Sequence, residues 1–340
     1  MKRWRNLLLG AFFSGFFLWL ALRGLDWRSV GVTLRNTQWG FVLLAMGMWS
    51  LGLAARAMRW RFLLGGQVAL GPTFHVLNVG FLLNNTLPFR IGELVRAYLI
   101  GRSKHGVTGW AALSTIATER ILDMLIVVLM LAAVLPVLAV DPAVITGGAL
   151  LGGTALLGFS VLLLLAHRPH WGHAVLRQVL RIAPPLARLQ PATLLDRLLD
   201  GLHPLTTRRG LLGAATWTAV AWACSVAGSW ILAGAFPALA QTPIMRAALT
   251  LSVVAASFSI IIPFTLASVG PFEAAAVFAL MTADVPRSTA ATYALVWHAG
   301  VVLVYGLWGV LGMLALGLSP GQLRHGAAAL EGSTPANASD

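Results

Sequence analysis

Six long segments without a charged side chain limit how this chain can fold. They cover residues 36–55, 62–89, 143–166, 210–245, 247–272 and 288–323. A helix of about 20 apolar residues crosses the hydrocarbon core of a bilayer. Charged residues make up only 10% of the chain, whereas soluble domains contain roughly 25%. Because the short alternating segments of a transmembrane β-barrel do not occur, we predict an all-α, polytopic membrane protein.

The charge of the chain is strongly positive. The net charge is +13, from 24 basic and 11 acidic residues. In membrane proteins positive charge collects in cytoplasmic loops and faces anionic lipid, so we expect no nucleic-acid partner. The single cysteine, Cys224, lies in an apolar segment, and the sequence has no metal-ligand spacing. We therefore expect neither a metal site nor a cofactor.

The apolar segments predict about six full transmembrane helices in one integral membrane domain, residues 1–318. The expected spans are about 6–22, 39–56, 107–140, 143–166, 211–236 and 288–317. The loop at about 167–209 carries seven arginines, which predicts that this loop and the N-terminus are cytoplasmic. No small-residue cleavage site follows the first span, so we expect it to be retained. The tail, 319–340, has no hydrophobic pattern and is expected to be disordered.

Two further segments are apolar but interrupted, at about 72–104 and 246–282. The first contains "NNTLPFRIGELVR", residues 84–96. Pro88 cannot sit in a helix interior and disfavours helix for Leu87, so one helix should end near Asn85–Leu87 and another should begin near Arg90. Because positive charge flanks both ends of this unit, we predict a re-entrant hairpin that enters from the cytoplasm and returns there.

The second interrupted segment contains "IPFTLASVGPFE", residues 262–273. Pro271 suits the first position of a helix capped by Gly270, and Glu273 then falls in its first turn. This hairpin should enter from the opposite side of the membrane. The two hairpins could therefore belong to an inverted repeat, and chance similarity is the alternative. Interrupted segments in the two halves of a chain indicate a transporter binding site.

Charged and polar side chains gather in these apolar surroundings. An ionisable residue inside a membrane costs at least about 2.5 kcal/mol at the bilayer centre, so a functional role is its default interpretation. The alternative is a structural ion-pair network that contacts no substrate. For Glu273, helix capping is an equally good explanation. The candidate substrate-binding residues are Asn84, Asn85, Pro88, Arg90, Gly92, Glu93, Arg96, Glu119, Arg120, Asp123, Gly270 and Glu273.

Spacing predicts how some of these side chains meet. Glu119 and Asp123, four residues apart in "TERILD", should share one face of a helix, where Arg120 can pair with Asp123. His75 and His298 each lie alone among apolar residues. Such histidines are more often packed or hydrogen-bonded than ligands, so we do not include them in the site.

These motifs resemble the lysylphosphatidylglycerol synthase transmembrane region family. The resemblance covers about residues 5–318 and rests on "NNTLPFRIGELVRAYLI", "ATERILDMLIVV" and "PFTLASVGPFEAA". The family includes the flippase half of the bacterial multiple peptide resistance factor and stand-alone members, some encoded with hopanoid lipid synthesis. Its usual Gly-Gly-x-Gly-x-x-Glu run is only partly matched, because "LASVGPFE" keeps Gly270 and Glu273 alone.

The resemblance implies an inner-membrane protein that moves a lipid between leaflets. Arg90 and Arg96, with Arg120 behind them, would bind the phosphate of a headgroup, since guanidinium is permanently charged and bidentate. Glu93, Glu119 and Asp123 would orient these arginines or contact a cationic headgroup. Asn84 and Asn85 would satisfy the backbone that the break leaves unpaired. The sequence has no nucleotide-binding motif, so movement should be downhill or coupled to an ion or proton.

Two other functions remain open. The chain could be an enzyme acting on a lipid-linked substrate, with Glu93 or Glu119 as base, or an accessory subunit of a lipid-synthesis complex. Family members that make aminoacylated lipid carry a large soluble domain, so we expect this chain not to be a synthase by itself. The expected partners are membrane lipids, with a second copy of the chain or lipid-synthesis enzymes left open as protein partners.

Overall fold

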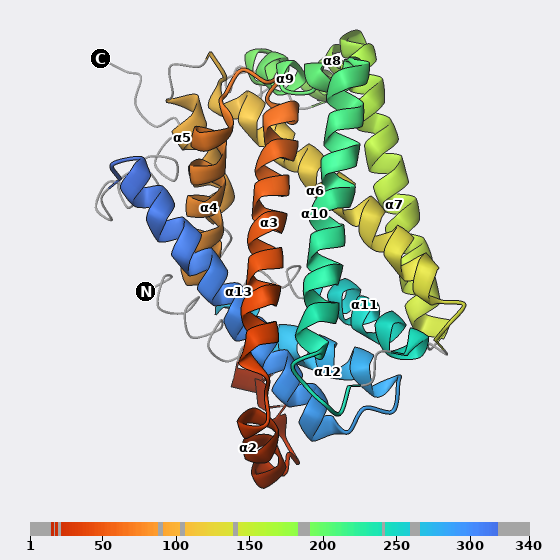
Figure 1. Ribbon diagram of the computed structural model, residues 1–340. Coiled ribbons are helices and arrows are strands. Elements are labelled where there is room, and N and C mark those ends of the chain that lie inside the picture. The colour runs from red at the N-terminus through yellow and green to blue at the C-terminus, as the bar shows by residue number, and fades with distance from the viewer. Residues whose placement is uncertain are drawn as a thin grey trace, which may run out of the picture.

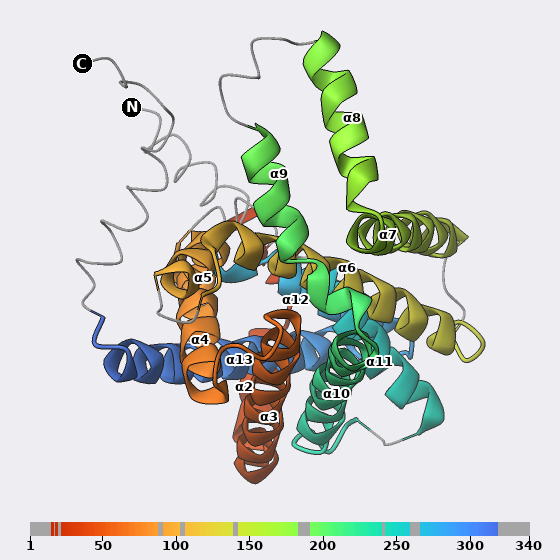
Figure 2. The same cartoon turned by 90° about the horizontal axis from the view of Figure 1, so that it is seen from above.

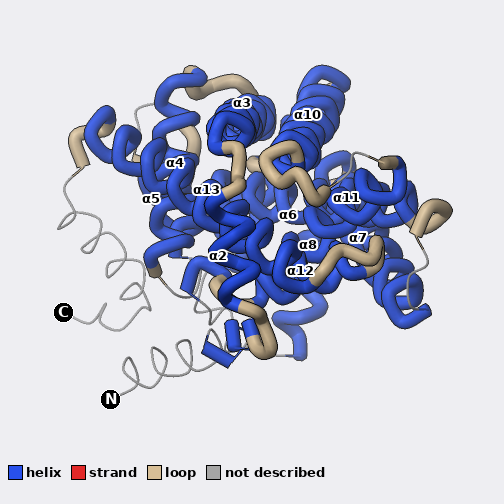
Figure 3. Tube along the Cα trace, turned by 60° about the horizontal axis from the view of Figure 1, so that its bottom comes forward, coloured by secondary structure: helices blue, strands red, loops and turns tan. Residues whose placement is uncertain are grey.

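The computed structural model is a helical bundle throughout the residues that it describes (Figures 1 and 3). These are residues 15–16, 18–19, 22–87, 91–102, 106–138, 142–182, 191–239, 242–258 and 266–318. No strand occurs among them. The all-α prediction is therefore confirmed. Most of the first expected span and the whole of the tail, 319–340, lie outside the described residues.

Five long helices form the frame of the bundle. They are α3 (Trp39–Leu63), α6 (Gly109–Val134), α7 (Pro142–His167), α10 (Arg208–Ala233) and α13 (Arg287–Ala315). Each has at least 25 residues, enough to cross a bilayer. Four are also apolar enough to be candidate spans on composition. The fifth, α6, carries Glu119, Arg120 and Asp123 in its middle.

The contacts between α3 and α10 show how these two helices run relative to each other. A Cβ atom added to Gly213 of α10 would meet Phe62 of α3, and one added to Gly228 would meet Trp49. One added to Gly234, the C-cap residue of α10, would meet Phe41. Residue numbers rise on one helix as they fall on the other, so the two helices are antiparallel. Leu63 and Arg208 therefore lie at one end of the bundle, and Trp39 and Ala233 lie at the other (Figure 1).

Two helical hairpins enter this frame from opposite ends. The first, α4 (Leu70–Thr86) and α5 (Ile91–Gly101), follows the Leu63 end of α3. The second, α11 (Pro243–Phe258) and α12 (Pro271–Met281), follows the Ala233 end of α10. The prediction of two broken segments is confirmed, and Leu87 is extended, as expected before a proline. The 3₁₀ turn Leu266–Ser268, next to the second tip, packs against α4.

The arms of the first hairpin touch backbone to backbone. A Cβ atom on Gly92 of α5 would lie 1.9 Å from the carbonyl oxygen of Gly80 on α4. A Cβ atom on Gly80 would lie 2.5 Å from Cγ of Arg96. Only glycine allows this approach, and it brings the side chains of α5 within reach of α3 and α6.

Gly92→Ala should therefore force the first hairpin open. Overpacking of this kind costs about 2–3 kcal/mol, and the loss should appear as a lower unfolding temperature in detergent micelles. Gly147→Ala in α7 is the matched control, because a Cβ atom there meets nothing within 4 Å. Equal unfolding temperatures for the two variants would contradict the close contact.

Shorter helices cover the two ends of the bundle. At the Trp39 end lies α2 (Trp27–Arg35), begun by the Asp26 side chain, which accepts a hydrogen bond from the Arg28 backbone N–H (Figure 3). At the other end, α8 (Pro169–Ile182) and α9 (Pro191–Asp200) follow α7, and α9 lies over α6 (Figure 2). Both lie in the basic segment expected to be cytoplasmic. The segment between the first two expected spans, which the sequence offered no reason to expect as a helix, is occupied mostly by α2.

Candidate functional site

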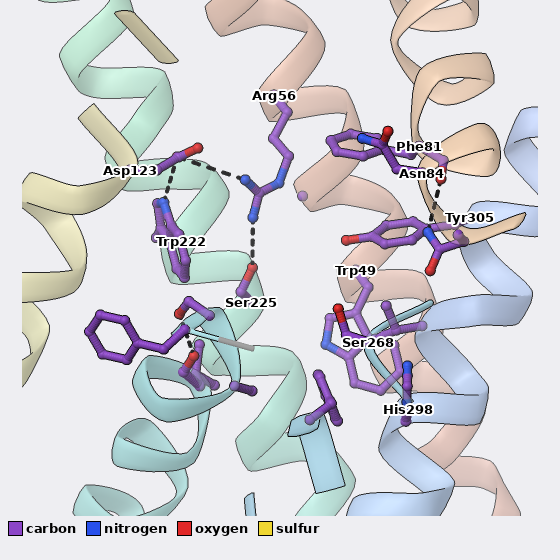
Figure 4. A pocket seen from close by; sticks show the side chains of 18 of the residues that line it. Trp49, Arg56, Phe81, Asn84, Asp123, Trp222, Ser225, Ser268, His298 and Tyr305 are labelled. Carbon is purple, nitrogen blue, oxygen red and sulfur yellow. Dashed lines mark hydrogen bonds and ion pairs between the residues drawn. The ribbon is translucent and has the colours of Figure 1, made fainter. Parts of the chain in front are cut away.

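A central cavity of about 300 Å³ is lined by residues of both hairpins and of α3, α6, α10 and α13. Aromatic and aliphatic side chains form most of its wall, including Trp49, Phe81 and Trp297. Charged or ionisable side chains on this wall include Arg56 with Asp123 at one place and His298, beside Ser268, at another (Figure 4). Neutral polar groups, those of Asn84, Asn85, Ser225, Ser257 and Tyr305, lie elsewhere on the wall. The cavity is thus mainly apolar, and we call the places around Arg56 and around His298 its two polar points.

Behind the first polar point lies an ion-pair network built from α3, α5 and α6. Four arginines and three carboxylates form it within the described residues, so it holds one positive charge in excess. Its members are Arg56, Arg59, Arg96, Arg120, Glu93, Glu119 and Asp123.

Arg59 is the centre of the ion-pair network. Its side chain is 1% exposed, and its Nη1 donates to Asp123 Oδ1 at 2.5 Å. Its Nε and Nη2 donate to Glu119 Oε1 at 3.3 and 3.2 Å. One guanidinium thus binds both carboxylates of α6, which confirms that Glu119 and Asp123 share a face. Trp222 Nε1 of α10 also donates to Asp123 Oδ1, at 2.9 Å.

The first hairpin joins the network through α5. Arg96 Nη2 donates to Glu119 Oε2 at 2.7 Å, and the guanidinium lies over the Trp60 ring, 4.1 Å from its centroid. Glu93 Oε1 lies 3.7 Å from Arg120 Nε, and Arg120 Nη1 lies 3.8 Å from Asp123 Oδ2. The predicted pairing of Arg120 with Asp123 is therefore confirmed. Buried pairs of this kind are costly to break, because the partner left behind is an unpaired charge.

Arg56 is held less tightly than Arg59 and Arg96. Its Nη1 lies 3.9 Å from Asp123 Oδ1, and its Nη2 donates to Ser225 Oγ at 3.4 Å. The guanidinium lies 5.3 Å from the centroid of the Trp222 ring and lines the cavity (Figure 4). Its long contacts leave donors of the guanidinium to face the cavity. The excess positive charge of the network is therefore presented there.

The predicted residues of the first hairpin have separate positions. Asn84 accepts a hydrogen bond from the Gly92 backbone N–H at 2.9 Å, and Asn85 donates to the Phe81 carbonyl at 2.9 Å. Asn84 thus satisfies a first-turn N–H of α5 next to the break, as expected, whereas the carbonyl that Asn85 contacts lies inside α4. Both asparagines line the cavity. Pro88 and Arg90 lie outside the described residues, so the role of Arg90 stays a prediction.

Not all of the described candidates line the cavity. Asn84, Asn85, Arg120 and Asp123 do. Arg96 and Glu119 are 2% and 0% exposed and lie behind the wall. Their position fits the alternative interpretation, in which they belong to a structural ion-pair network and do not contact substrate. The same holds for Gly92, which serves the contact between α4 and α5. Glu93 does not line the cavity itself but pairs with Arg120, which does.

The sequence interpretation missed Arg56 and Arg59 as members of the site. It ended the second span at residue 56 and treated "RAMRWR" as a basic flank. In the structure α3 continues to Leu63, which puts Arg56 roughly 10 Å inside the end of the helix. The spacing of three between Arg56 and Arg59 was the available signal, because it places both on the face that meets Glu119 and Asp123.

The second polar point belongs to α12 and α13. Gly270 caps α12, Pro271 is its first residue, and the Gly270 N–H donates to Glu273 Oε2 at 2.7 Å. The capping role of Glu273 is confirmed. Its other oxygen, Oε1, lies 2.6 Å from Nδ1 of His298, and His298 Nε2 lies 2.9 Å from the Ala267 carbonyl oxygen. His298 is thus hydrogen-bonded, as expected for a lone histidine in an apolar segment.

The turn before α12 adopts a backbone conformation that favours glycine. Ala267 has φ +50° and Ser268 has φ +60°. These are the two positions where the usual Gly-Gly-x-Gly-x-x-Glu run has glycine. A residue with a side chain costs about 1–2 kcal/mol in this region. The chain keeps the turn of the motif without its first two glycines, and so holds it under strain.

Ala267→Gly and Ser268→Gly should each relieve that strain. Glycine loses more conformational freedom on folding, so the net gain should be about 0.5–1 kcal/mol. Thermal unfolding in detergent measures it. Gly270→Ala, at φ +95°, should change stability in the opposite direction. A loss of stability in both glycine variants would mean that the turn has another backbone conformation.

The described side chains around the cavity do not form a group that could hold a metal ion. Among the described residues no group of three or more His, Cys, Asp and Glu side chains is placed to hold a metal ion. The carboxylates near the cavity are instead bound by arginine, by Trp222 and by His298. The site therefore offers cations, hydrogen-bond donors and apolar surface to a ligand.

Similarity to known proteins was found at the level of a protein family. A search of curated proteins finds no match. Comparison with protein families matches residues 7–309 to "Lysylphosphatidylglycerol synthase TM region". The match includes both hairpins, all five frame helices up to Gly309 of α13 and every described member of the candidate site. The chain is therefore a membrane protein that belongs to the lysylphosphatidylglycerol synthase transmembrane region family.

Proposed function

We infer that this protein moves a polar lipid, such as a phospholipid, between the leaflets of the bacterial inner membrane. One observation carries the proposal. Two hairpins enter from opposite ends of the bundle, and residues that flank their breaks, Leu87, Phe258 and Ala267, border one cavity that has mainly apolar walls and a cationic point. Irregular backbone at membrane depth persists only where protein or a water-filled cavity surrounds it, and such breaks mark the binding sites of transporters.

The chemistry of the cavity fits a phosphate-bearing headgroup. Arg56 and Arg120 line it, and arginine binds phosphate with two parallel hydrogen bonds. Asn84, Asn85 and Ser225 add neutral polar groups to the wall of the same cavity. The aromatic and aliphatic wall can cover the glycerol and upper acyl carbons. A polar lipid has this same division, a charged head joined to apolar chains.

The charge balance favours this function over an accessory role with purely structural charges. A structural network has no need of an excess cation that faces a cavity. Arg59 and Arg96 both donate to Glu119 behind the wall, whereas Arg56 makes a long hydrogen bond, a long ion pair and a cation–π contact beside the cavity. We assign the buried part of the network to holding α3, α5 and α6 together, and Arg56 with Arg120 to the lipid.

Leaflet exchange of fluorescent phospholipids in proteoliposomes tests the proposal. The protein should accelerate exchange over protein-free vesicles for at least one headgroup, without a divalent metal and without chemical change of the lipid. Mass spectrometry of the recovered lipid checks the second point. A modified lipid product would indicate an enzyme instead. Background exchange for every headgroup from a folded protein would contradict the proposal and favour an accessory subunit.

A further inference from the structure

His298 has both ring nitrogens against hydrogen-bond acceptors. Nε2 lies 2.9 Å from the carbonyl oxygen of Ala267, and Nδ1 lies 2.6 Å from Oε1 of Glu273. A carbonyl oxygen can only accept, so Nε2 carries a proton and donates it. In a neutral imidazole the other nitrogen, Nδ1, is then an acceptor with a lone pair.

The contact between His298 and Glu273 therefore requires a further proton. Oε2 of Glu273 accepts from the Gly270 N–H at 2.7 Å, which leaves Oε1 to face Nδ1. Two acceptors at 2.6 Å would repel each other. The proton sits either on Nδ1, as imidazolium beside carboxylate, or on Oε1, as carboxyl beside neutral imidazole. Both forms contain the same number of protons, so this count does not depend on the tautomer.

The surroundings bury the Glu273–His298 pair and hold the imidazole in place. The side chains of His298 and Glu273 are 7% and 4% exposed, and Phe272 stacks on the imidazole at 4.4 Å between ring centroids. In the described residues Glu273 is the one titratable group in contact with His298. The other titratable or charged groups on α13 and on the elements packed against it are Asp26, Arg28, Arg35, Arg56, Arg59, Arg61, His75, Arg208, Arg209, Cys224, Arg287, Tyr293 and Tyr305.

The site also borders the central cavity. His298, Ala267 and Ser268 all line it, at the polar point away from Arg56 (Figure 4). His298 is 11 residues into α13, roughly 16 Å from the start of the helix. A proton bound here lies at membrane depth, beside the space that the proposed function gives to the lipid.

We propose that Glu273 and His298 form a proton-binding site whose occupancy ties the tip of the second hairpin to α13. With the proton bound, His298 joins the Ala267 carbonyl on one side to the start of α12 on the other. When the proton leaves, neutral His298 keeps a single N–H, so one ring nitrogen faces an acceptor with a lone pair, either Glu273 or the Ala267 carbonyl, and the link opens at that contact. The strained turn at Ala267 and Ser268 is then free to move. That this movement couples lipid transfer to a proton rests on the proposed function.

Nitrogen-15 spectra of histidine-labelled protein in liposomes test the site without any transport. The difference between wild type and His298→Gln isolates the His298 signals. At low pH we expect both ring nitrogens to lie against bound protons, one of them in a strong hydrogen bond to Glu273, and we expect one nitrogen to become bare as the pH is raised through the pH range of the titration. One bare ring nitrogen over the whole range would overturn the proposal. So would a proton that never leaves.

Lipid exchange then tests the coupling. Glu273→Gln is the informative variant, because the glutamine amide can accept from Gly270 and donate to Nδ1 with no proton to lose. Wild type should change its exchange rate across the same pH range, and Glu273→Gln should exchange at a rate independent of pH. The matched control is His173→Gln, since His173 and Asp196 form an exposed pair at 3.1 Å, and it should keep the wild-type profile.

The outcomes of this second test separate the two proposals. If Glu273→Gln exchanges lipid with the same pH profile as wild type, proton coupling is wrong and translocation stands. If no headgroup is exchanged by any folded variant, the proposed function fails, while the spectra still decide whether the pair binds a proton.

Discussion

Arg59→Met is expected to cost the folded protein about 3–5 kcal/mol, the usual range for removing one partner of a buried ion pair. The side chain of Arg59 is 1% exposed and donates to both Glu119 and Asp123. Methionine fills a similar volume, so the loss should come from charge and not from a cavity. Thermal unfolding in detergent micelles should show a large fall, or the protein should fail to accumulate in the membrane.

Two variants make this prediction specific. Arg59→Met combined with Asp123→Asn removes one charge of each sign and keeps an oxygen for the Trp222 N–H, so much of the lost stability should return. Arg61→Met on the same helix removes a half-buried arginine whose Nε donates to the Val68 carbonyl, at a cost of about 0.5–1.5 kcal/mol. If Arg59→Met were as mild as Arg61→Met, the network would not hold the frame together.

Arg56→Gln is expected to lower lipid exchange at least tenfold with little loss of stability. A hydrogen bond to a charged group contributes about 1.5–3 kcal/mol, and about 1.4 kcal/mol corresponds to a factor of ten in rate. Among the described residues Arg56 makes a hydrogen bond of 3.4 Å, an ion pair of 3.9 Å and a cation–π contact with Trp222 at 5.3 Å. Because these contacts are long, its removal should leave the unfolding temperature nearly unchanged. Exchange in proteoliposomes and unfolding of the same preparation measure the two effects together.

The matched controls follow from the geometry of this arginine. Arg56→Lys keeps the charge but not the planar pair of donors, so exchange should fall between wild type and Arg56→Gln. Arg246 is exposed on α11 and lies 5.6 Å from the centroid of the Trp230 ring, an arrangement like that of Arg56 over Trp222. Arg246→Gln should leave exchange unchanged. Equal losses for the two glutamine variants would remove the case for a specific headgroup contact at Arg56.

The breaks in the two hairpins were predictable from sequence because their causes are local. Proline fixes its own φ and restricts the residue before it, so the end of α4 at Thr86 follows from Pro88. The cap of α12 follows in the same way from the order of Gly270, Pro271 and Glu273. Such signals need no knowledge of which helices pack together.

The membership of the ion-pair network was not predictable in the same way. A charged residue at the edge of an apolar segment is normally placed in a loop, because burying it alone is too costly. Arg56 and Arg59 remain inside α3 because α6 supplies Glu119 and Asp123 at the same depth. That compensation is a tertiary fact, and the contact of His298 with Glu273, 25 residues away, is another.

The most direct test of the account is to find where a lipid headgroup binds. A phospholipid with a photoreactive headgroup can be cross-linked to the protein in liposomes and mapped by mass spectrometry of the peptides. The account predicts labels on residues that line the cavity, such as Asn85 of α4, Met124 of α6 and Ser225 of α10. These residues are named because they line the cavity that Arg56 also lines, and the labels should be lost in Arg56→Gln. Labels confined to lipid-facing residues such as Leu150 of α7 or Leu314 of α13, and unchanged in that variant, would contradict a headgroup site in the central cavity.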